Sequence, residues 1–378
     1  MEILSELVKR FRTGIDYNTR EKYSYDWGAL SPQILKHRKL PDAVVWLDNK
    51  EEVKEFIELQ SDYHFRIVER GRGTNTLGGA MPVKDESIVV LPTMSDFKIE
   101  GGVLSASPGT EFSQLDLSLI PVYPTSYATA TIGGYVGGGS LGIGSLKYGA
   151  MWDNITKVEV ITPKGDFLLE GEDVKKVAQS AGTVGIITRI WMKLVKKEEV
   201  KIKEFKVSTL KEAIDVALNN VDEAEMITIR NNKMASEISS LKGEDTNWGK
   251  WNVFIGSRDE GKEISSKDIV TTFAGSYFTL VNREKTSYMS IDLDVYSLES
   301  LEGSDYMVEC DFARSSGRLF SHTYILGYTE EPKIDGKTFN LHSFRINDRV
   351  EEDRLKKIVE FKRTVDPEDY MNPGKLVF

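Results

Sequence analysis

Glycine is concentrated in one stretch of the chain, and this stretch most constrains the fold. Fifteen of the 31 glycines lie between Gly71 and Gly149, about a fifth of the 378 residues. Glycine permits positive φ and lets the backbone approach another group closely. Apolar runs at 65–68, 87–91 and 103–106 lie among these glycines, and short runs bounded by turns predict strands. The stretch therefore predicts a folded scaffold with ligand-facing loops rather than a flexible low-complexity segment.

Length and composition exclude several classes of protein. With 378 residues, 40% of them apolar, the chain can form two domains with buried cores. No apolar run reaches the roughly 18–20 residues of a membrane-spanning helix, and the net charge of −10 argues against a nucleic-acid binder. The single cysteine, Cys310, excludes an internal disulfide and cysteine-rich metal or iron–sulfur sites held by this chain alone. The N-terminus does not resemble a signal peptide, which favours a cytoplasmic location.

Patterns along the chain predict an α+β protein. Residues 41–47 are typical of a strand, 48–59 of a helix, and 65–69 of the next strand, which gives a β-α-β unit. A charged connection at 195–201 marks a candidate domain boundary. Beyond it glycine is sparse. Further strands are predicted at 157–162, 167–170, 185–194, 204–207 and 251–255, and further helices at 210–221, 263–274 and 351–361.

The first glycine-rich loop covers residues 70–80 and follows a predicted strand. Its sequence, Arg-Gly-Arg-Gly-Thr-Asn-Thr-Leu-Gly-Gly-Ala, can present successive backbone N–H groups to an anion, and a pyrophosphate is the natural occupant. It is not a Rossmann fingerprint, because the third glycine is missing and no helix follows. It is not a P-loop either, because no Gly-Lys-Ser/Thr follows. On these residues alone, a plain tight turn is the alternative.

The order of motifs along the chain resembles a known family. A Ser/Thr run at 124–131 leads into repeated glycines, which suits a flat ligand held by backbone groups. The motifs are Arg-Gly-x-Gly-Thr-x-x-x-Gly-Gly from residue 70, Thr-Ile-Gly-Gly from 131, Tyr-Gly from 148, Gly-Thr-x-Gly-Ile-Ile-Thr from 182 and Asn-Pro-Gly-Lys from 372. This order is similar to that of the FAD-linked oxidases of the vanillyl-alcohol oxidase / p-cresol methylhydroxylase type, in their glycolate oxidase and D-lactate dehydrogenase branch.

The resemblance implies a two-part FAD-binding domain built from both chain ends, with an inserted α+β substrate (cap) domain. The expected divisions are 1–195 for the FAD-binding domain, 196–350 for the cap domain and 351–378 for the returning segment. It also implies an FAD contact for the residues that match the family motifs. These are Arg70, Gly71, Arg72, Gly73, Thr74, Asn75, Thr76, Gly78, Gly79, Ser126, Thr131, Ile132, Gly133, Gly134, Gly138, Gly139, Tyr148, Gly182, Gly185, Ile187, Asn372 and Lys375.

Two departures from the family refine these expectations. Members with a histidine-linked flavin carry that histidine where this chain has Arg72, and Cys310 lies in the predicted cap domain. We therefore expect the FAD to be bound non-covalently. The 2-hydroxyacid branch usually carries a His-x-Gly-Asp-Gly-Asn-x-His stretch, and residues 321–328 and 340–345 do not match it. We therefore expect no metal, and the substrate stays open.

Oxidation of a 2-hydroxy acid needs a cation for the carboxylate, a base for the hydroxyl proton and the flavin N5 for the hydride. Arginine binds a carboxylate through two parallel hydrogen bonds, and histidine is a base near neutral pH. The alternation of a strand puts His322 and Tyr324 on one face and separates His342 from Arg345. Each candidate also has an ordinary interpretation as a surface charge or polar partner. The catalytic candidates are His322, His342, Arg345, Arg314 and Arg318.

These patterns predict an FAD-dependent oxidoreductase that oxidises a small hydroxylated substrate, with a 2-hydroxy acid of the glycolate or D-lactate type as the leading candidate. An external acceptor is needed, namely a quinone, an electron-transfer flavoprotein, oxygen or an iron–sulfur partner subunit. A non-catalytic flavin-bearing subunit of a multiprotein dehydrogenase is the alternative, motivated by the missing histidine motif. A third interpretation is the enolpyruvyl-sugar reductase of cell-wall synthesis, and the Asn-Pro-Gly-Lys tail argues against it.

Overall fold

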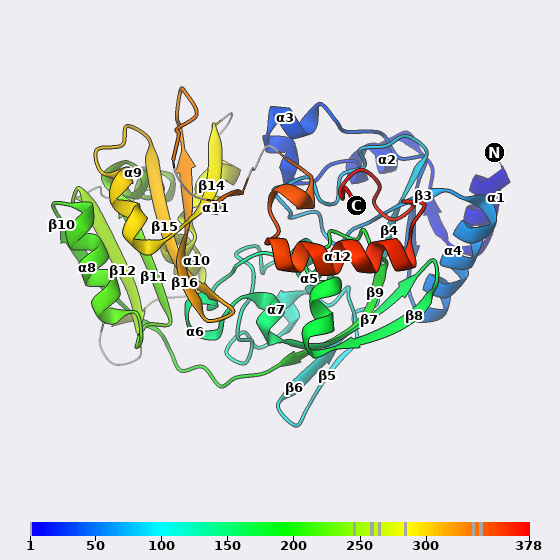
Figure 1. Ribbon diagram of the computed structural model, residues 1–378, viewed down its shortest axis with the longest axis horizontal. Helices are drawn as coiled ribbons and strands as arrows, with labels where there is room; N and C mark the ends of the chain where they lie inside the picture. The colour runs from blue at the N-terminus through cyan, green and yellow to red at the C-terminus, as the bar shows by residue number, and fades with distance from the viewer. Residues whose placement is uncertain are drawn as a thin grey trace.

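Three β-sheets organise the described part of the chain, two in one lobe and one in the other (Figure 1). The computed structural model describes residues 2–244, 247–257, 261–263, 266–282, 286–334, 337–339 and 343–378. Helices and strands are both abundant in these ranges, which confirms the predicted α+β class. Within the same ranges, no helix combines the length and the apolar content needed to cross a membrane.

The first sheet contains the predicted β-α-β unit. Its strands, in spatial order, are β1 (Arg12–Gly14), β2 (Ala43–Leu47), β4 (Ser87–Pro92) and β3 (Arg66–Glu69). The accompanying helices are α1 (Glu2–Arg10), α2 (Tyr17–Tyr23), η1 (Trp27–Leu30), α3 (Pro32–Leu35) and α4 (Lys50–Tyr63). β2, β4 and β3 are parallel, so α4 serves as the crossover connection between β2 and β3. α4 begins at Asn49, whose side chain accepts a hydrogen bond from the Glu52 N–H at 2.9 Å.

The second sheet is antiparallel and completes the same lobe. Its strands, in spatial order, are β5 (Phe97–Glu100), β6 (Val103–Ala106), β9 (Ile186–Lys193), β7 (Ile155–Thr162) and β8 (Gly165–Glu170). Short helical segments lie around it: η2 (Phe112–Gln114), α5 (Ile132–Gly138), α6 (Ser145–Tyr148), α7 (Met151–Asn154) and η3 (Gly171–Lys176). α4 contacts β2 of the first sheet and β7 and β9 of the second, so it lies between the two sheets.

The third sheet has eight antiparallel strands and forms the other lobe (Figure 1). In spatial order they are β13 (Lys262–Glu263), β10 (Lys201–Val207), β12 (Trp251–Ser257), β11 (Met226–Asn231), β15 (Met307–Ser315), β16 (Arg318–Leu326), β14 (Tyr288–Leu293) and β17 (Lys337–Phe339). Its helices are α8 (Leu210–Asn220), α9 (Asn232–Lys242), α10 (Ser266–Phe273), α11 (Gly275–Asn282) and η4 (Val295–Leu301).

The two faces of the third sheet differ in polarity. Apolar side chains of its central strands pack with α8 and η4 in one buried cluster. The opposite face carries a polar row formed by Thr228, Asp311, His322 and Asp292, which are neighbours in register on β11, β15, β16 and β14. Because side chains alternate along a strand, the apolar cluster leaves this row on the other side. The row therefore lies on the face turned toward residues 141–146, which line a cavity together with Thr228, Asp311 and His322.

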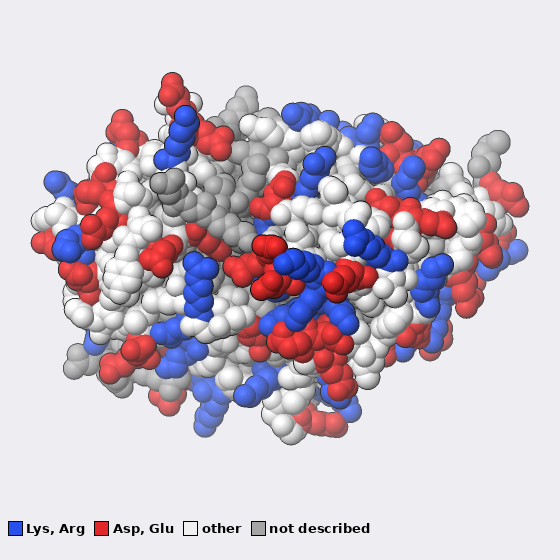
Figure 2. All heavy atoms as spheres, viewed as in Figure 1, with Lys and Arg blue, Asp and Glu red and all other residues white. Residues whose placement is uncertain are grey.

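The C-terminal segment returns to the first lobe through η5 (Ile346–Asp348) and α12 (Glu352–Val365) (Figure 1). The tail pairs with β3, because Ile67 donates to the Tyr370 carbonyl at 2.8 Å and Asn372 donates to the Ile67 carbonyl at 2.6 Å. Acidic and basic side chains interleave over α12 (Figure 2), and Lys357 pairs with Glu172 of η3 at 2.9 Å. Both ends of the chain therefore build one lobe. The exact domain boundaries at 195/196 and 350/351 stay predictions.

Candidate functional site

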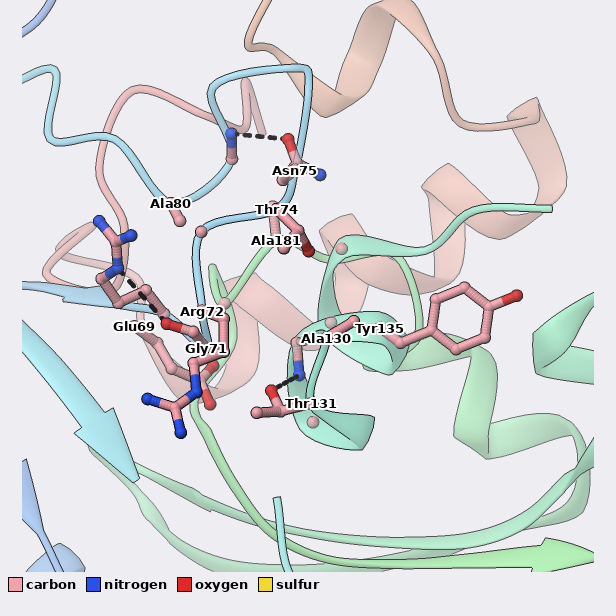
Figure 3. A pocket seen from close by; sticks show the side chains of 18 of the residues that line it. Glu69, Gly71, Arg72, Thr74, Asn75, Ala80, Ala130, Thr131, Tyr135 and Ala181 are labelled. Carbon is pink, nitrogen blue, oxygen red and sulfur yellow. Dashed lines mark hydrogen bonds between the residues drawn. The ribbon is translucent and has the colours of Figure 1, made fainter. Parts of the chain in front are cut away.

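A cleft of about 880 Å³, open to solvent, lies where the two glycine-rich loops meet (Figure 3). The first loop supplies residues 69–75, 79 and 80, the second supplies residues from 124 to 140, and residues 181 and 182 close one side. Of the residues predicted to contact FAD, the cleft is lined by Arg70, Gly71, Arg72, Gly73, Thr74, Asn75, Gly79, Ser126, Thr131, Gly133, Gly134, Gly138, Gly139 and Gly182.

Glycine is required where the loops touch. A Cβ on Gly71 would stand 2.4 Å from the Thr131 hydroxyl oxygen, and one on Gly133 would stand 2.5 Å from the Pro108 ring. Real Cβ atoms do not approach other atoms so closely, so any side chain would separate the loops. Gly138 instead lines the cleft itself, where a side chain would occupy space meant for a ligand. A concave surface of exposed backbone fits a pyrophosphate and the flat rings of a dinucleotide.

Short side chains hold the two loops in shape (Figure 3). Asn75 Oδ1 accepts hydrogen bonds from the N–H groups of Leu77 at 2.8 Å and Gly79 at 3.1 Å. Thr131 is the N-cap of α5, and its hydroxyl accepts from the Gly134 N–H at 3.2 Å. These side chains therefore satisfy the backbone of the loops and fix the direction of the glycine segments.

The two arginines of the first loop line the cleft, and both are bound by other protein groups. Arg70 is buried and donates through Nη1 to the carbonyl oxygens of Tyr23 at 2.7 Å and Tyr25 at 2.8 Å. Burial lowers the pKa of Arg70. Arg72 pairs with Glu111, with Nε 2.7 Å from the carboxylate. Both guanidinium groups thus have partners in the protein, and the cleft wall is mainly backbone.

Sequence reasoning missed Glu69, which ends β3 and lines the cleft. Its Oε1 accepts a hydrogen bond from the Ile187 N–H at 3.2 Å. Burial raises the pKa of Glu69 to about 8. The signal that would have found it is a charged residue directly before the Arg-Gly-x-Gly motif, at the end of a strand.

The C-terminal candidates brace the first loop from behind. Asn372 donates through Nδ2 to the carbonyl oxygens of Gly79, at 2.8 Å, and Ala181. Lys375 donates to the carbonyl oxygens of Met81, at 2.7 Å, and Gly78. Burial lowers the pKa of Lys375 to about 7. Neither side chain lines the cleft, so the structure places them as supports of its walls.

The remaining predicted contacts lie beside the cleft. Ile132 is in the hydrophobic core, and the Ile187 N–H binds Glu69 as above. Gly185 packs against β7, where a Cβ would stand 2.6 Å from the Ile161 carbonyl oxygen. Tyr148 donates to Glu225 at 3.4 Å, across the lobes.

A second cavity of about 730 Å³ adjoins the cleft. Gly139 and Ser140 line both, so the two spaces are adjacent. The second cavity lies between the lobes, since its walls come from the polar face of the third sheet, from the loop before α12 and from Trp152 of α7. Thr76, predicted to contact FAD, lines this cavity.

His322 and Asp292 form a pair in this second cavity. Their Nδ1 and Oδ1 atoms are 2.6 Å apart, and the two residues are neighbours in register on β16 and β14. The Tyr324 ring packs edge-on against the imidazole, with ring centroids 4.8 Å apart. Both His322 and Tyr324 line the cavity, in keeping with the alternation of the strand.

The other catalytic candidates lie elsewhere. Arg314 donates to Asp222 at 3.1 Å and to the Leu146 carbonyl at 3.2 Å. Arg318 is exposed at the turn between β15 and β16, and Arg345 precedes η5; neither lines the cavity. His342 lies outside the described residues.

Sequence reasoning also missed four charged residues of this cavity, Asp292, Arg349, Glu351 and Arg354. Their positions depend on how the third sheet and α12 meet, and no local pattern marks them.

Comparison with known proteins identifies an FAD-binding domain in this chain. Residues 41–169 match the family described as FAD binding domain. The glycolate oxidase subunit GlcD of Bacillus subtilis is 30% identical over 220 residues, 53% of this chain and 45% of the relative. The mitochondrial D-lactate dehydrogenase [cytochrome] of Arabidopsis thaliana is 26% identical over 239 residues, 57% of this chain and 42% of the relative. Each match thus spans less than half of the relative's length.

Solved structures share the fold over nearly the whole chain. An alkyldihydroxyacetonephosphate synthase covers 98% of this chain and 86% of its own, with a TM-score of 0.68 and 17% identity. Phl p 4.0202, a glucose dehydrogenase, covers 98% of both chains with a TM-score of 0.70 and 14% identity. These likenesses show the fold alone. Together, the matches confirm the resemblance found in the sequence and identify FAD as the cofactor.

Proposed function

We propose that this chain, which carries an FAD-binding domain, is an FAD-dependent oxidoreductase that oxidises a small 2-hydroxy acid. The observation that carries the proposal is the His322–Asp292 pair in the cavity adjoining the cleft. A bound FAD would supply a hydride acceptor, which is the chemistry required at the carbon that bears the hydroxyl group. The relatives named glycolate oxidase and D-lactate dehydrogenase support this substrate class.

His322 is positioned to accept the hydroxyl proton. Asp292 lies 2.6 Å from Nδ1, which favours the tautomer with a proton on Nδ1 and the basic lone pair on Nε2. The perpendicular Tyr324 ring limits rotation of the imidazole. The base is therefore oriented before the substrate binds, which lowers the entropic cost of reaching the reactive geometry.

The cleft would hold the dinucleotide along its glycine-lined wall. We expect the backbone of residues 71–75 and the first turn of α5 to bind the pyrophosphate. The ring end belongs near Gly139 and Ser140, because these residues line both the cleft and the cavity that contains His322. No histidine or cysteine of the described residues lines the cleft, which supports non-covalent FAD.

An external electron acceptor completes the proposed reaction. A quinone, an electron-transfer flavoprotein, oxygen or an iron–sulfur partner subunit would serve. The alternative, a flavin-bearing subunit without turnover of its own, gives no reason for an oriented histidine base between the lobes. We therefore favour the enzyme.

Anaerobic mixing of the FAD-loaded chain with a panel of 2-hydroxy acids tests the proposal. We expect bleaching of the yellow flavin band, and a 10²- to 10⁴-fold slower rate for His322→Asn, the usual contribution of a general base. His64→Asn is the matched control, because His64 is exposed and has a φ of 57°, which asparagine tolerates. A His322→Asn variant as fast as wild type would contradict the role of His322. No bleaching with any 2-hydroxy acid would favour the subunit.

A further inference from the structure

Arg349 is a buried cation with no hydrogen-bond partner among the described residues. It is 1% exposed and lines the second cavity, and Nε, Nη1 and Nη2 all lack a partner. The negative charges of Asp26 and Asp348 raise the pKa of Arg349. Asp26 already accepts two backbone N–H groups. A buried charge that is not hydrogen-bonded to a carboxylate is costly, and no described residue forms such a pair with Arg349, so an anionic ligand would stabilise it.

Arg354 is a second cation of the same cavity. It is the third residue of α12, and its guanidinium group stacks 3.6 Å from the centroid of the Trp152 ring. Its Nη1 is buried and without a partner. The negative charges of Glu351, Asp153 and Asp292 raise the pKa of Arg354. None of these three groups affects the pKa of Arg349. The two guanidinium groups therefore have different acidic neighbours and line the same cavity.

Both arginines are charged at neutral pH and available to a ligand. Burial lowers their pKa values only to about 10. Asp292 is held by His322 at 2.6 Å, and Glu351 is exposed at the start of α12. The guanidinium fork matches a carboxylate in shape and charge. A neutral hydroxylated ligand would leave both charges unpaired.

We propose that the substrate is a 2-hydroxy dicarboxylate, with one carboxylate paired with Arg349, the other paired with Arg354 and the hydroxyl group facing His322. This inference rests on the proposed function, because it names the substrate of the same cavity. A monocarboxylate would leave one of the two guanidinium groups unpaired, which favours the diacid.

Binding of unreactive acids to the FAD-loaded chain tests the inference without turnover. Glutarate and succinate are expected to raise Tm and to bind at least ~10-fold more tightly than butyrate, because the second charge-assisted pair adds affinity. The dissociation constants come from titrating the change in the flavin spectrum. Equal affinity for glutarate and butyrate would overturn the inference.

Variants of the two arginines locate the diacid site. Arg349→Gln and Arg354→Gln are each expected to weaken glutarate binding by roughly 10- to 100-fold. Arg363→Gln is the matched control, because Arg363 is exposed in the last turn of the same helix, and it should bind glutarate as wild type does. A folded, FAD-loaded variant that retains wild-type affinity would overturn the assignment. If a variant does not fold, the acid preference of the wild-type protein decides.

Turnover separates this inference from the proposed function. Malate and 2-hydroxyglutarate are expected to bleach the flavin faster than lactate and glycolate, with both enantiomers of each chiral acid compared. Bleaching by the monocarboxylates alone would overturn the diacid inference and leave the proposed function standing. If no 2-hydroxy acid bleaches the flavin, the proposed function fails, while tight and selective glutarate binding would still support the diacid site.

Discussion

Glu69 carries a carboxyl group that lines the cleft, and its titration affects stability. Burial raises its pKa to about 8, opposed in part by the hydrogen bond from the Ile187 N–H. In an unfolded chain, glutamate titrates near ~4.3. Between these pH values the folded state keeps a proton that the unfolded chain has lost. The folded state therefore loses stability as the pH rises from about 4 to about 8.

Glu69→Gln removes this titration. We expect the variant to be more stable than wild type above pH 8, by ~1–3 kcal/mol, because it no longer has to bury an ionised carboxylate. The difference should vanish below about pH 4, where the wild-type carboxyl group is neutral in both states. Urea unfolding of the FAD-free protein from pH 4 to 9 measures it. Glu58→Gln is the control, because Glu58 is exposed on α4. A difference that does not change with pH would contradict the role of Glu69.

The shape of the cleft depends on a contact between two elements, because the loop after β3 must touch the first turn of α5. Gly71→Ala would place a Cβ 2.4 Å from the Thr131 hydroxyl oxygen. We expect this variant to bind FAD at least ~10-fold more weakly, since an overpacked contact of this kind costs roughly 1–3 kcal/mol. FAD titration by fluorescence quenching measures the loss. Thr131→Ala in the same chain removes the hydroxyl and should restore part of the affinity.

A matched glycine variant separates overpacking from backbone strain. Gly317 lies in the turn between β15 and β16 with a φ of +79°, and a Cβ there would meet nothing within 4 Å. Gly317→Ala should therefore cost stability through its φ alone and leave FAD affinity unchanged. Weaker FAD binding in Gly317→Ala would contradict the packing argument, and so would unchanged FAD binding in Gly71→Ala.

Local patterns predicted the elements of the cleft, and long-range contacts determined the rest. The strand and helix that begin the β-α-β unit could be predicted because alternation and an asparagine cap act within a few residues. Gly71 and Gly133 could be predicted as special because no other residue fits where loops meet. Asp292 could not be predicted, because its partner His322 lies 30 positions away in the sequence. Arg349 could not be predicted either, because its buried nitrogens form no hydrogen bond with the protein that a pattern could reveal.

At the scale of the whole molecule, the cavity exists only because the two lobes meet. His322 comes from the third sheet, Arg354 from α12 and Gly139 from the cleft. The charges on the surface alternate in sign over α12 (Figure 2), whereas the cationic groups of the cavity lie inside. The net charge of the chain, −10 at neutral pH, therefore says little about the ligand, and the buried arginines determine which anion binds.

The returning C-terminal tail also supports the cleft, and a variant of Asn372 tests this role. Its Nδ2 joins the carbonyl oxygens of Gly79 and Ala181, which belong to two different walls of the cleft. The backbone of Asn372 has a φ of 41°, a conformation that alanine adopts at a cost in free energy. We expect Asn372→Ala to lower the free energy of unfolding by about 2–4 kcal/mol, from two lost hydrogen bonds and the strained φ.

The same variant should release FAD more readily, because the two walls are no longer joined. Asn372→Gly keeps the φ accessible and loses only the hydrogen bonds, so it should weaken FAD binding as much as Asn372→Ala while costing less stability. Glu368→Ala, in the exposed part of the tail, is the control and should match wild type in both measurements. If Asn372→Gly retains wild-type FAD affinity, the tail contributes to folding alone and the proposed bracing of the cleft is wrong.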